Sequence, residues 1–237
     1  MSNLDDCRQK LVVANRILAH ENVMDAYGHV SIRHPDQPDR FLMSCSRSPE
    51  LVTLDDLMEF DLDCNPVAPD DRRLYGERPI HGAIYKARPD VQAVVHNHSH
   101  DVLPYTVSRN LALRPMIHSA ACIGHELPVW DIRSRFGDTN LLVLTMDHGR
   151  DLAQRLGSNA VVLMRGHGCT VVADTIEQVV MRTIYLTVNA KLQLATLPYG
   201  DITFLSEREI ELSSELHFST VSMSRAWEYW ARRSGSV

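Results

Sequence analysis

Lysine is scarce in this sequence, with Lys10, Lys86 and Lys191 as the only three among 237 residues. Enzymes that form a Schiff base with a carbonyl substrate or a pyridoxal cofactor need a lysine nucleophile. The chain therefore offers few candidates for a lysine-dependent aldolase or a pyridoxal mechanism.

Cysteine is present in a pattern that argues against two other classes of site. The five cysteines are an odd number without a Cys-x-x-Cys pair: Cys7, Cys45, Cys64, Cys122 and Cys169. This pattern indicates neither a disulfide framework nor a zinc site built from thiolates. We expect reduced thiols that are mostly structural.

Long apolar runs are missing as well. No stretch reaches the roughly 18 residues that a membrane span needs, and the polar start at 1–6 lacks the basic and apolar regions of a signal peptide. The net charge of −6 and the isoelectric point near 6.0 give no reason to expect nucleic acid or an anionic membrane as a partner. We expect a cytoplasmic protein whose ligand is a small molecule.

Helical and strand patterns alternate along a chain of ordinary composition, with 44% apolar and 23% charged residues. The apolar spacing predicts helices at 4–21, 77–87, 101–108, 147–156, from a cap at 174–175 to about 196, and between 207 and 232. Strands are predicted at 30–33, 41–44, 57–61, 91–95, near 116, within 124–131, at 160–165 and at 169–173. Because we find no repeat or linker, we predict one α/β or α+β domain over 1–237.

Three histidines lie where two predicted strands end. His96 and His98 follow the apolar run 91–95, and His167 lies between Gly166 and Gly168 after a second apolar run. Side chains at i and i+2 project from one face of a strand, so His96 and His98 can share a cation that a third ligand reaches from a neighbouring strand. Three imidazoles suit zinc or a similar divalent ion and leave a coordination position open for substrate. Flanking glycines permit close approach of the backbone and positive φ.

Glu77 opens the helix that leads into the histidine strand, and His81 lies four residues later on the same helical face. An acidic residue at a helix N-terminus has a purely structural explanation, since it interacts favourably with the helix dipole. Near a dication the same carboxylate can act as a ligand or as the acid or base that moves a substrate proton. Both interpretations of Glu77 remain open from the sequence.

Other residues near these segments have competing interpretations. Four arginines can clamp a carboxylate through two hydrogen bonds or remain solvated at the surface: Arg47, Arg72, Arg73 and Arg78. The same choice between a substrate contact and a structural role applies to Tyr27, Tyr75 and His118. In the C-terminal segment Trp227-Glu228-Tyr229-Trp230, packing or a subunit contact is the default role, and a direct catalytic role is the alternative.

Several motifs, in order along the chain, resemble those of the class II aldolase/adducin family of metal-dependent sugar-phosphate aldolases and epimerases. The resemblance covers roughly Leu11 to Thr196 and rests on these segments: Gly28-His29-Val30-Ser31, Ser44-Cys45-Ser46-Arg47, Glu77 through His81, Ala93-Val94-Val95-His96-Asn97-His98, and Gly166-His167-Gly168. The histidine pair combined with the later His-Gly is the most specific part of the pattern.

The resemblance implies an α/β fold with three layers, in which a central, largely antiparallel sheet lies between helices, followed by a helical tail at about 205–232. It also implies a homotetramer with active sites at subunit boundaries. One divalent ion per subunit would be held by His96, His98 and His167, with zinc favoured and manganese, cobalt or iron as alternatives. Glu77 would be the catalytic acid/base.

Departures from the family pattern bear on the substrate. Where sugar-phosphate enzymes of the family bind phosphate, this chain carries His29, Arg47 and Tyr75-Gly76, which remove donors and room from a phosphate cradle. Arg47 beside its neighbouring serines can bind a planar carboxylate instead. The candidate substrate-binding residues are His29, Ser44, Ser46, Arg47, Tyr75, His118 and Tyr229.

This pattern resembles the family's decarboxylase branch, whose members act on dihydroxyphthalate and on carboxylated ring-cleavage products of aromatic catabolism. We therefore predict a metal-dependent lyase that decarboxylates a hydroxylated aromatic or related carboxylate, through an enolate or phenolate that the metal stabilises. Three alternatives remain: a sugar-phosphate aldolase or epimerase, a non-haem iron oxygenase, and an adducin-like binding module without catalysis.

Overall fold

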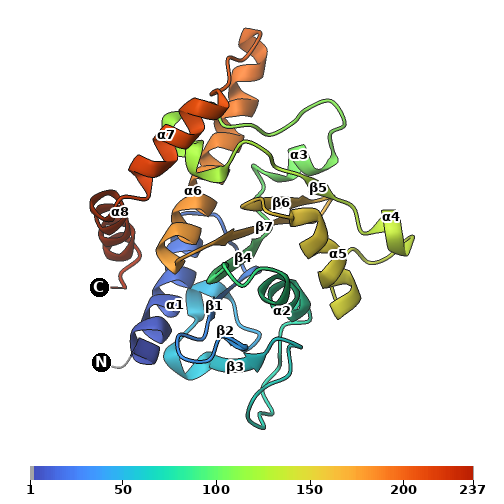
Figure 1. The fold of residues 1–237 in the computed structure, drawn as a ribbon, viewed down its shortest axis with the longest axis vertical. Coiled ribbons are helices and arrows are strands. Elements are labelled where there is room, and N and C mark those ends of the chain that lie inside the picture. Colours follow the sequence, from blue (N-terminus) through green and yellow to red (C-terminus); the bar gives the residue numbers. More distant parts are fainter. Residues whose placement is uncertain (1–2, 237) are drawn as a thin grey trace.

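A seven-stranded sheet organises the protein, as the computed structural model shows for residues 3–236 (Figure 1). The strands are β1 (His29–Arg33), β2 (Arg40–Ser44), β3 (Leu57–Asp61), β4 (Ala93–Asn97), β5 (Val129–Trp130), β6 (Val161–Met164) and β7 (Gly168–Ala173). Their order is β3-β2-β1-β4-β7-β6-β5, and every neighbouring pair is antiparallel except β5 and β6. The predicted largely antiparallel sheet is confirmed.

Helices cover both faces of this sheet (Figure 1). They are α1 (Asn3–His20), α2 (Arg78–Ala87), α3 (Leu103–Val107), α4 (Arg133–Phe136), α5 (Met146–Leu156), α6 (Ile176–Thr196), α7 (Glu207–His217) and α8 (Thr220–Arg233), with a 3-10 helix η3 at His118–Ile123. Shorter 3-10 turns lie at Pro49–Leu51, Leu54–Asp56 and Leu197–Tyr199. The three-layer α-β-α architecture expected from the resemblance is therefore present.

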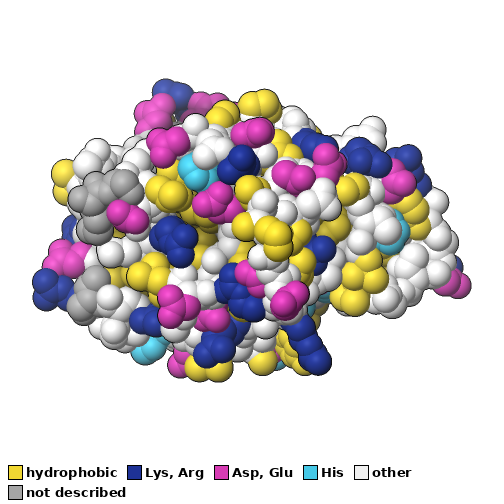
Figure 2. All heavy atoms as spheres, turned by 90° about the horizontal axis from the view of Figure 1, so that it is seen from below, with side chains coloured by type: hydrophobic (Ala, Val, Ile, Leu, Met, Phe, Trp, Pro, Cys, Tyr) yellow, Lys and Arg dark blue, Asp and Glu magenta, His cyan; other side chains and the backbone are white. Residues whose placement is uncertain are grey.

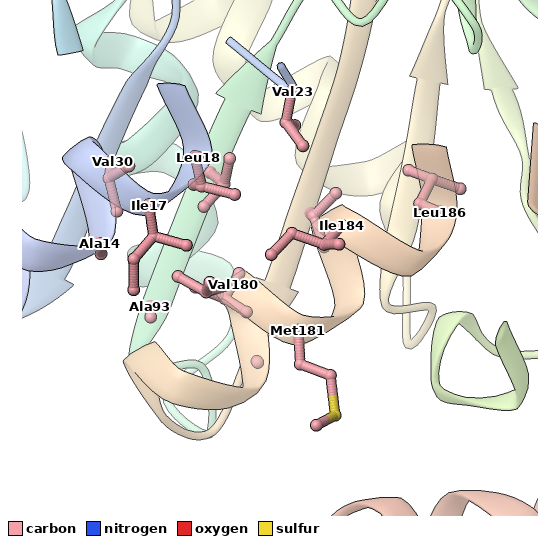
Figure 3. Packing of buried hydrophobic residues seen from close by; sticks show 14 of the residues in the cluster. Ala14, Ile17, Leu18, Val23, Val30, Ala93, Val180, Met181, Ile184 and Leu186 are labelled. Atoms are coloured by element: carbon pink, nitrogen blue, oxygen red, sulfur yellow. The ribbon is translucent and has the colours of Figure 1, made fainter. Parts of the chain in front are cut away.

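The alternation of side chains along each strand divides the core in two. On one face, Ala93 and Val95 of β4 pack with apolar residues of α1 and α6, such as Ile17 and Ile184 (Figure 3). On the other face, Val94 of the same strand belongs to a second apolar cluster that α2 and α5 cover. Because neighbouring residues of a strand face opposite sides, both layers are anchored on the same central strands.

Close contact between α2 and α5 fixes the layer that carries the start of α2. A methyl group added at Gly149 of α5 would lie 2.3 Å from the carbonyl oxygen of Pro79 and 2.9 Å from the Cβ of Ala83, both in α2. The two helices thus meet backbone to backbone at this point, which only glycine permits. This contact fixes the first turn of α2, and Glu77 lies immediately before that turn.

Two predictions of secondary structure were wrong. The strand predicted near Met116 does not form, because the Met116 amide donates to Asn189 Oδ1 of α6, 2.9 Å away, and the chain then enters η3. The single helix predicted between 207 and 232 is two helices, because the Ser219 side chain accepts from the Ser222 amide and starts α8 anew. The histidine strand also ends later than predicted, at Asn97.

The surface mixes charges of both signs. Figure 2 shows basic and acidic side chains interspersed over one face of the molecule, with apolar side chains between them. Across residues 3–236, no helix combines the length and the apolar character needed to cross a bilayer.

Candidate metal centre

The cluster of three histidines forms where β4 ends and β7 begins. These strands are antiparallel neighbours, with His96 opposite Thr170 and Asn97 opposite Cys169. His96 lies in β4, His98 follows one residue after its end, and His167 occupies the turn between β6 and β7. The pairing of the two strands therefore brings together residues that are about seventy positions apart in the sequence.

Both glycines beside His167 have the roles expected from the sequence. Gly166 has a φ of +65°, a conformation that residues with a side chain rarely adopt. A Cβ on Gly168 would lie 2.1 Å from the carbonyl oxygen of Asn97 and 3.1 Å from Cδ2 of His98. Gly168 thus permits β7 to approach the end of β4 closely enough for the three rings to meet.

The distances within the cluster suit one shared cation. The ring centroids of His96, His98 and His167 are each 4.9 Å from one another. Nε2 of His96 lies 3.0 Å from Nε2 of His98. Oε2 of Glu77 lies 3.7 Å from Nε2 of His96 and 3.5 Å from Nε2 of His167. One ligand atom from each of the four residues falls within 4.8 Å of all the others.

Hydrogen bonds outside the cluster orient two of its members. Nδ1 of His96 donates to the carbonyl oxygen of Cys169 over 3.1 Å, which leaves Nε2 unprotonated in the neutral ring. The amide of Val143 donates to Oε1 of Glu77 over 2.8 Å, so the other carboxylate oxygen is free to face the histidines. Partners of this kind fix the orientation of metal ligands.

The environment of these residues fits a divalent ion. In the described chain both ring nitrogens of His167 are buried without a well-formed hydrogen bond, and the carboxylate of Glu77 lies 3.5 Å from Nε2. Buried polar atoms of this kind are rare unless something binds them. Burial lowers the pKa of His96 and of His98, so both rings favour the neutral form that binds metals. Burial alone would raise the pKa of Glu77, but the neighbouring His167 and His96 outweigh it and hold that pKa below its usual range.

A cavity of about 670 Å³ opens beside His98. In the described chain its lining includes the carboxylates of Asp25, Glu50 and Asp101 but no lysine or arginine. Of the four clustered residues Glu77, His96, His98 and His167, His98 is the one that lines this cavity. The cavity thus reaches the histidine cluster at His98, and its charged lining is acidic.

Two candidate substrate-binding residues lie close to the histidine cluster. His29 of β1 is paired with His96 across the sheet, and their ring centroids are 5.0 Å apart. The ring of Tyr75 is 4.7 Å from that of His29. Burial raises the pKa of Tyr75, and its interaction with the Ser44 side chain opposes that rise. His29, Ser44 and Tyr75 thus form one neighbourhood at the cluster.

Arg47 and Ser46 are placed differently. The Tyr75 hydroxyl donates to the carbonyl oxygen of Arg47, but the Arg47 side chain lies elsewhere. Its Nε donates to the Leu51 carbonyl over 2.8 Å and lies 3.2 Å from Oδ2 of Asp56. Ser46 is exposed, and its amide donates to the carbonyl oxygen of Arg73.

His118 and Tyr229 lie in another part of the subunit. They line a cavity of about 520 Å³ between η3, α6, α7 and α8, which shares no lining residue with the histidine cluster. The ring of His118 is 4.6 Å from that of His217, which sequence reasoning did not select. The structure therefore does not bring these two candidates to the metal centre of the same subunit.

Sequence reasoning also missed a buried chain of polar side chains behind His29. Nδ1 of His29 lies 2.6 Å from Nε2 of His81, and Nδ1 of His81 lies 2.6 Å from Oγ of Ser31. Oγ of Ser31 is in turn 2.8 Å from the Tyr85 hydroxyl. The available signal was the i, i+2 spacing of His29 and Ser31 and the i, i+4 spacing of His81 and Tyr85.

Comparisons with known proteins agree with this geometry. The family described as "Class II Aldolase and Adducin N-terminal domain" matches residues 9–194. The chain is 37% identical to "Decarboxylase tropJ" of Talaromyces stipitatus, over 91% of this chain and 89% of that protein. It is 30% identical to the 3,4-dihydroxyphthalate decarboxylase of Arthrobacter keyseri, over 81% and 79%. An aldolase II superfamily protein from Pseudomonas syringae has the same fold, with a TM-score of 0.80, 23% identity, and coverage of 100% of this chain and 96% of that one.

Proposed function

The chain belongs to the class II aldolase and adducin family, and from that premise we propose that it is a metal-dependent carbon–carbon lyase that decarboxylates a hydroxylated aromatic carboxylate. The observation that carries the proposal is the cluster of Glu77, His96, His98 and His167. Two relatives of the chain, at 37% and 30% identity over 91% and 81% of its length, are named as decarboxylases. Decarboxylation is therefore favoured over aldol cleavage.

We assign the metal to His96, His98 and His167, with zinc first and manganese, cobalt or iron as alternatives. A bound dication supplies Lewis acidity where negative charge develops as the carbon–carbon bond breaks. Three protein ligands leave room for substrate oxygen atoms. The orphaned nitrogens of His167 support the assignment, because a bound ion gives one of them a partner.

Glu77 is the proposed acid/base. Its Oε1 is fixed by the Val143 amide, while Oε2 faces the histidine cluster. In the proposed reaction the carboxylate accepts a proton from the substrate hydroxyl. The bond to the leaving carboxylate then breaks, carbon dioxide departs, and the electron pair stays on the substrate. Glu77 returns the proton to the carbon that lost the carboxylate, either directly or through a water molecule.

Substrate binding is proposed for residues around this centre. His29, Ser44 and Tyr75 flank the cluster, and we assign them to the substrate's oxygen atoms. Arg47, with Ser46, is assigned to a further carboxylate of the substrate. Because Nε of Arg47 already contacts Leu51 and Asp56, this contact uses the other nitrogens of the guanidinium group.

His118 and Tyr229 line a different cavity from the histidine cluster and do not contact the candidate metal site of their own subunit. We therefore propose that they contact substrate across a subunit boundary of a homotetramer. The reason for this proposal is that they line a cavity that shares no residue with the histidine cluster. The oligomeric state of the metal-loaded protein, measured by analytical ultracentrifugation, tests this part of the proposal.

The reaction is tested with protein reconstituted with one metal at a time. The assay measures carbon dioxide released from a panel of hydroxylated aromatic carboxylates that includes 3,4-dihydroxyphthalate, with Glu77→Gln as the matched variant. We expect release that depends on metal and falls by about 10²- to 10⁴-fold in the variant, the contribution typical of a positioned acid/base. Cleavage of a sugar phosphate without release from any aromatic acid overturns the proposal, and oxygen consumption during turnover replaces it with an oxygenase.

A further inference from the structure

The buried chain behind His29 has only two possible directions of hydrogen bonding. Its members are His29, His81, Ser31 and Tyr85, whose exposed fractions are 3%, 0%, 0% and 1%. Since burial favours neutral imidazole, each ring carries one proton, on Nδ1 or on Nε2. Each hydroxyl likewise has one hydrogen to donate. The direction of the hydrogen bond at either end, at His29 or at Tyr85, therefore determines the direction of the others.

The surroundings of the Tyr85 hydroxyl determine which of the two directions is present. Within residues 3–236, its side-chain partner is Ser31, and the Val94 backbone also interacts with the phenol oxygen; no hydrogen bond from this hydroxyl to a carbonyl oxygen is found there. If Ser31 donated to Tyr85, the hydrogen of the phenol would be buried without an acceptor, which is the costlier arrangement. Tyr85 therefore donates to Ser31, and Ser31 uses its own hydrogen on Nδ1 of His81.

The direction of the Ser31 hydrogen bond also fixes the protons of His81 and His29. With Nδ1 of His81 accepting, the proton of that ring is on Nε2 and is donated to Nδ1 of His29. His29 then carries its proton on Nε2. Among the described residues the hydrogen bond of this ring is through Nδ1, and its centroid lies 5.0 Å from that of His96 and 4.7 Å from that of Tyr75.

We propose that His29 is a fixed hydrogen-bond donor to a substrate oxygen atom, and that His81, Ser31 and Tyr85 are positioning residues that hold its proton on Nε2. This inference rests on the proposed function for the identity of the substrate. A donor held in this form selects an oxygen that accepts, such as a carboxylate or a deprotonated phenol or enol. It also stabilises the oxygen on which charge develops as carbon dioxide leaves.

The tautomer is tested without any assay of activity. In the zinc-loaded protein labelled with ¹⁵N-histidine, NMR shows which nitrogen of each ring carries the proton, and His29→Leu assigns the His29 signals. We expect a single Nε2–H tautomer for His29. We also expect a second tautomer to appear in His81→Leu, which removes the donor to Nδ1. A His29 protonated on Nδ1 in the unaltered protein overturns the inference, whether or not the protein is a decarboxylase.

The kinetic test separates positioning from structure. We expect kcat/KM to fall about 100-fold in His29→Leu, the loss typical of one oxyanion donor, and about two- to tenfold in His81→Leu, where only part of the population keeps the donor tautomer. Tyr105→Phe is the matched control. Tyr105 is equally buried, but its hydroxyl donates to the Ala190 carbonyl and takes no part in the hydrogen bonds that link Tyr85 to His29.

Zinc content and melting temperature are measured for all three variants. Unchanged turnover in His29→Leu overturns the substrate contact. An equal loss in Tyr105→Phe and His81→Leu shows a merely structural effect and overturns the role of the chain. Absence of decarboxylation in the unaltered protein falsifies the proposed function instead, and the NMR result still decides the tautomer.

Discussion

At the residue scale, His167 is the member of the candidate metal centre whose surroundings are the most unusual. Its two buried nitrogens make no well-formed hydrogen bond in residues 3–236, and its neighbours Gly166 and Gly168 permit the turn that holds it. Within the described residues, its polar neighbour is the carboxylate of Glu77, 3.5 Å from Nε2. Without a ligand, burying these nitrogens lowers the stability of the folded protein, because a buried polar group without a hydrogen bond is unfavourable.

Replacing this ligand tests the centre directly. We expect His167→Ala to weaken zinc binding by at least about 100-fold, since even the loss of an outer partner of a metal ligand costs 10- to 100-fold. His118→Ala is the matched control, because His118 lies outside the cluster. Metal content after dialysis against a graded chelator gives the measurement. Equal zinc retention by the two variants would contradict the assignment of His167.

The sequence was sufficient to select the four residues that the structure brings together as a possible metal site, but not the row of hydrogen-bonded side chains behind His29. His96 and His98 follow from strand alternation, and Gly166-His167-Gly168 marks a crowded turn by itself. The hydrogen bonds of His81, in contrast, join residues at least 50 positions apart. They exist only because β1 lies under α2, and no local spacing encodes that contact.

At the scale of elements, packing between α2 and α5 governs where Glu77 sits. Substituting Gly149→Ala places a methyl group 2.3 Å from the Pro79 carbonyl oxygen. We expect the variant to lose about 1–3 kcal/mol of unfolding free energy, as overpacked sites do. Arg150→Ala, on the exposed side of the same helix, is the control and should change stability by less than about 0.5 kcal/mol. Urea denaturation compares the two, and equal midpoints would refute the close contact.

Element boundaries were the least predictable part of the fold, for identifiable reasons. The segment near Met116 has strand-like composition, but Asn189 of α6 satisfies its amide in place of a neighbouring strand. The C-terminal helical pattern is continuous in the sequence, yet Ser219 caps a new helix within it. Both outcomes depend on single side chains that compete for backbone groups, and hydrophobic periodicity does not detect them.

The C-terminal helix α8 contributes apolar side chains to the core, although the family match ends at residue 194. Trp230 of α8 is 6% exposed and belongs to the core that α1 and α6 share. We expect Trp230→Ala to destabilise the protein by about 3–5 kcal/mol, as for other buried large residues, and to leave zinc binding unchanged. Tyr229→Ala, at a residue that is 55% exposed, is the control. Calorimetry measures both, and similar melting temperatures for the two variants would show that α8 is dispensable.

The acidic lining of the cavity beside His98 has a consequence for the order of events. Carboxylates at the entrance create a negative potential that draws in cations and repels anions over about 10 Å at 0.1 M ionic strength. This potential attracts a divalent cation, whereas it repels an anionic aromatic acid until a bound cation has offset part of the charge of these carboxylates. We therefore expect zinc to bind before an anionic substrate, and we expect added salt to slow zinc uptake by the apoprotein.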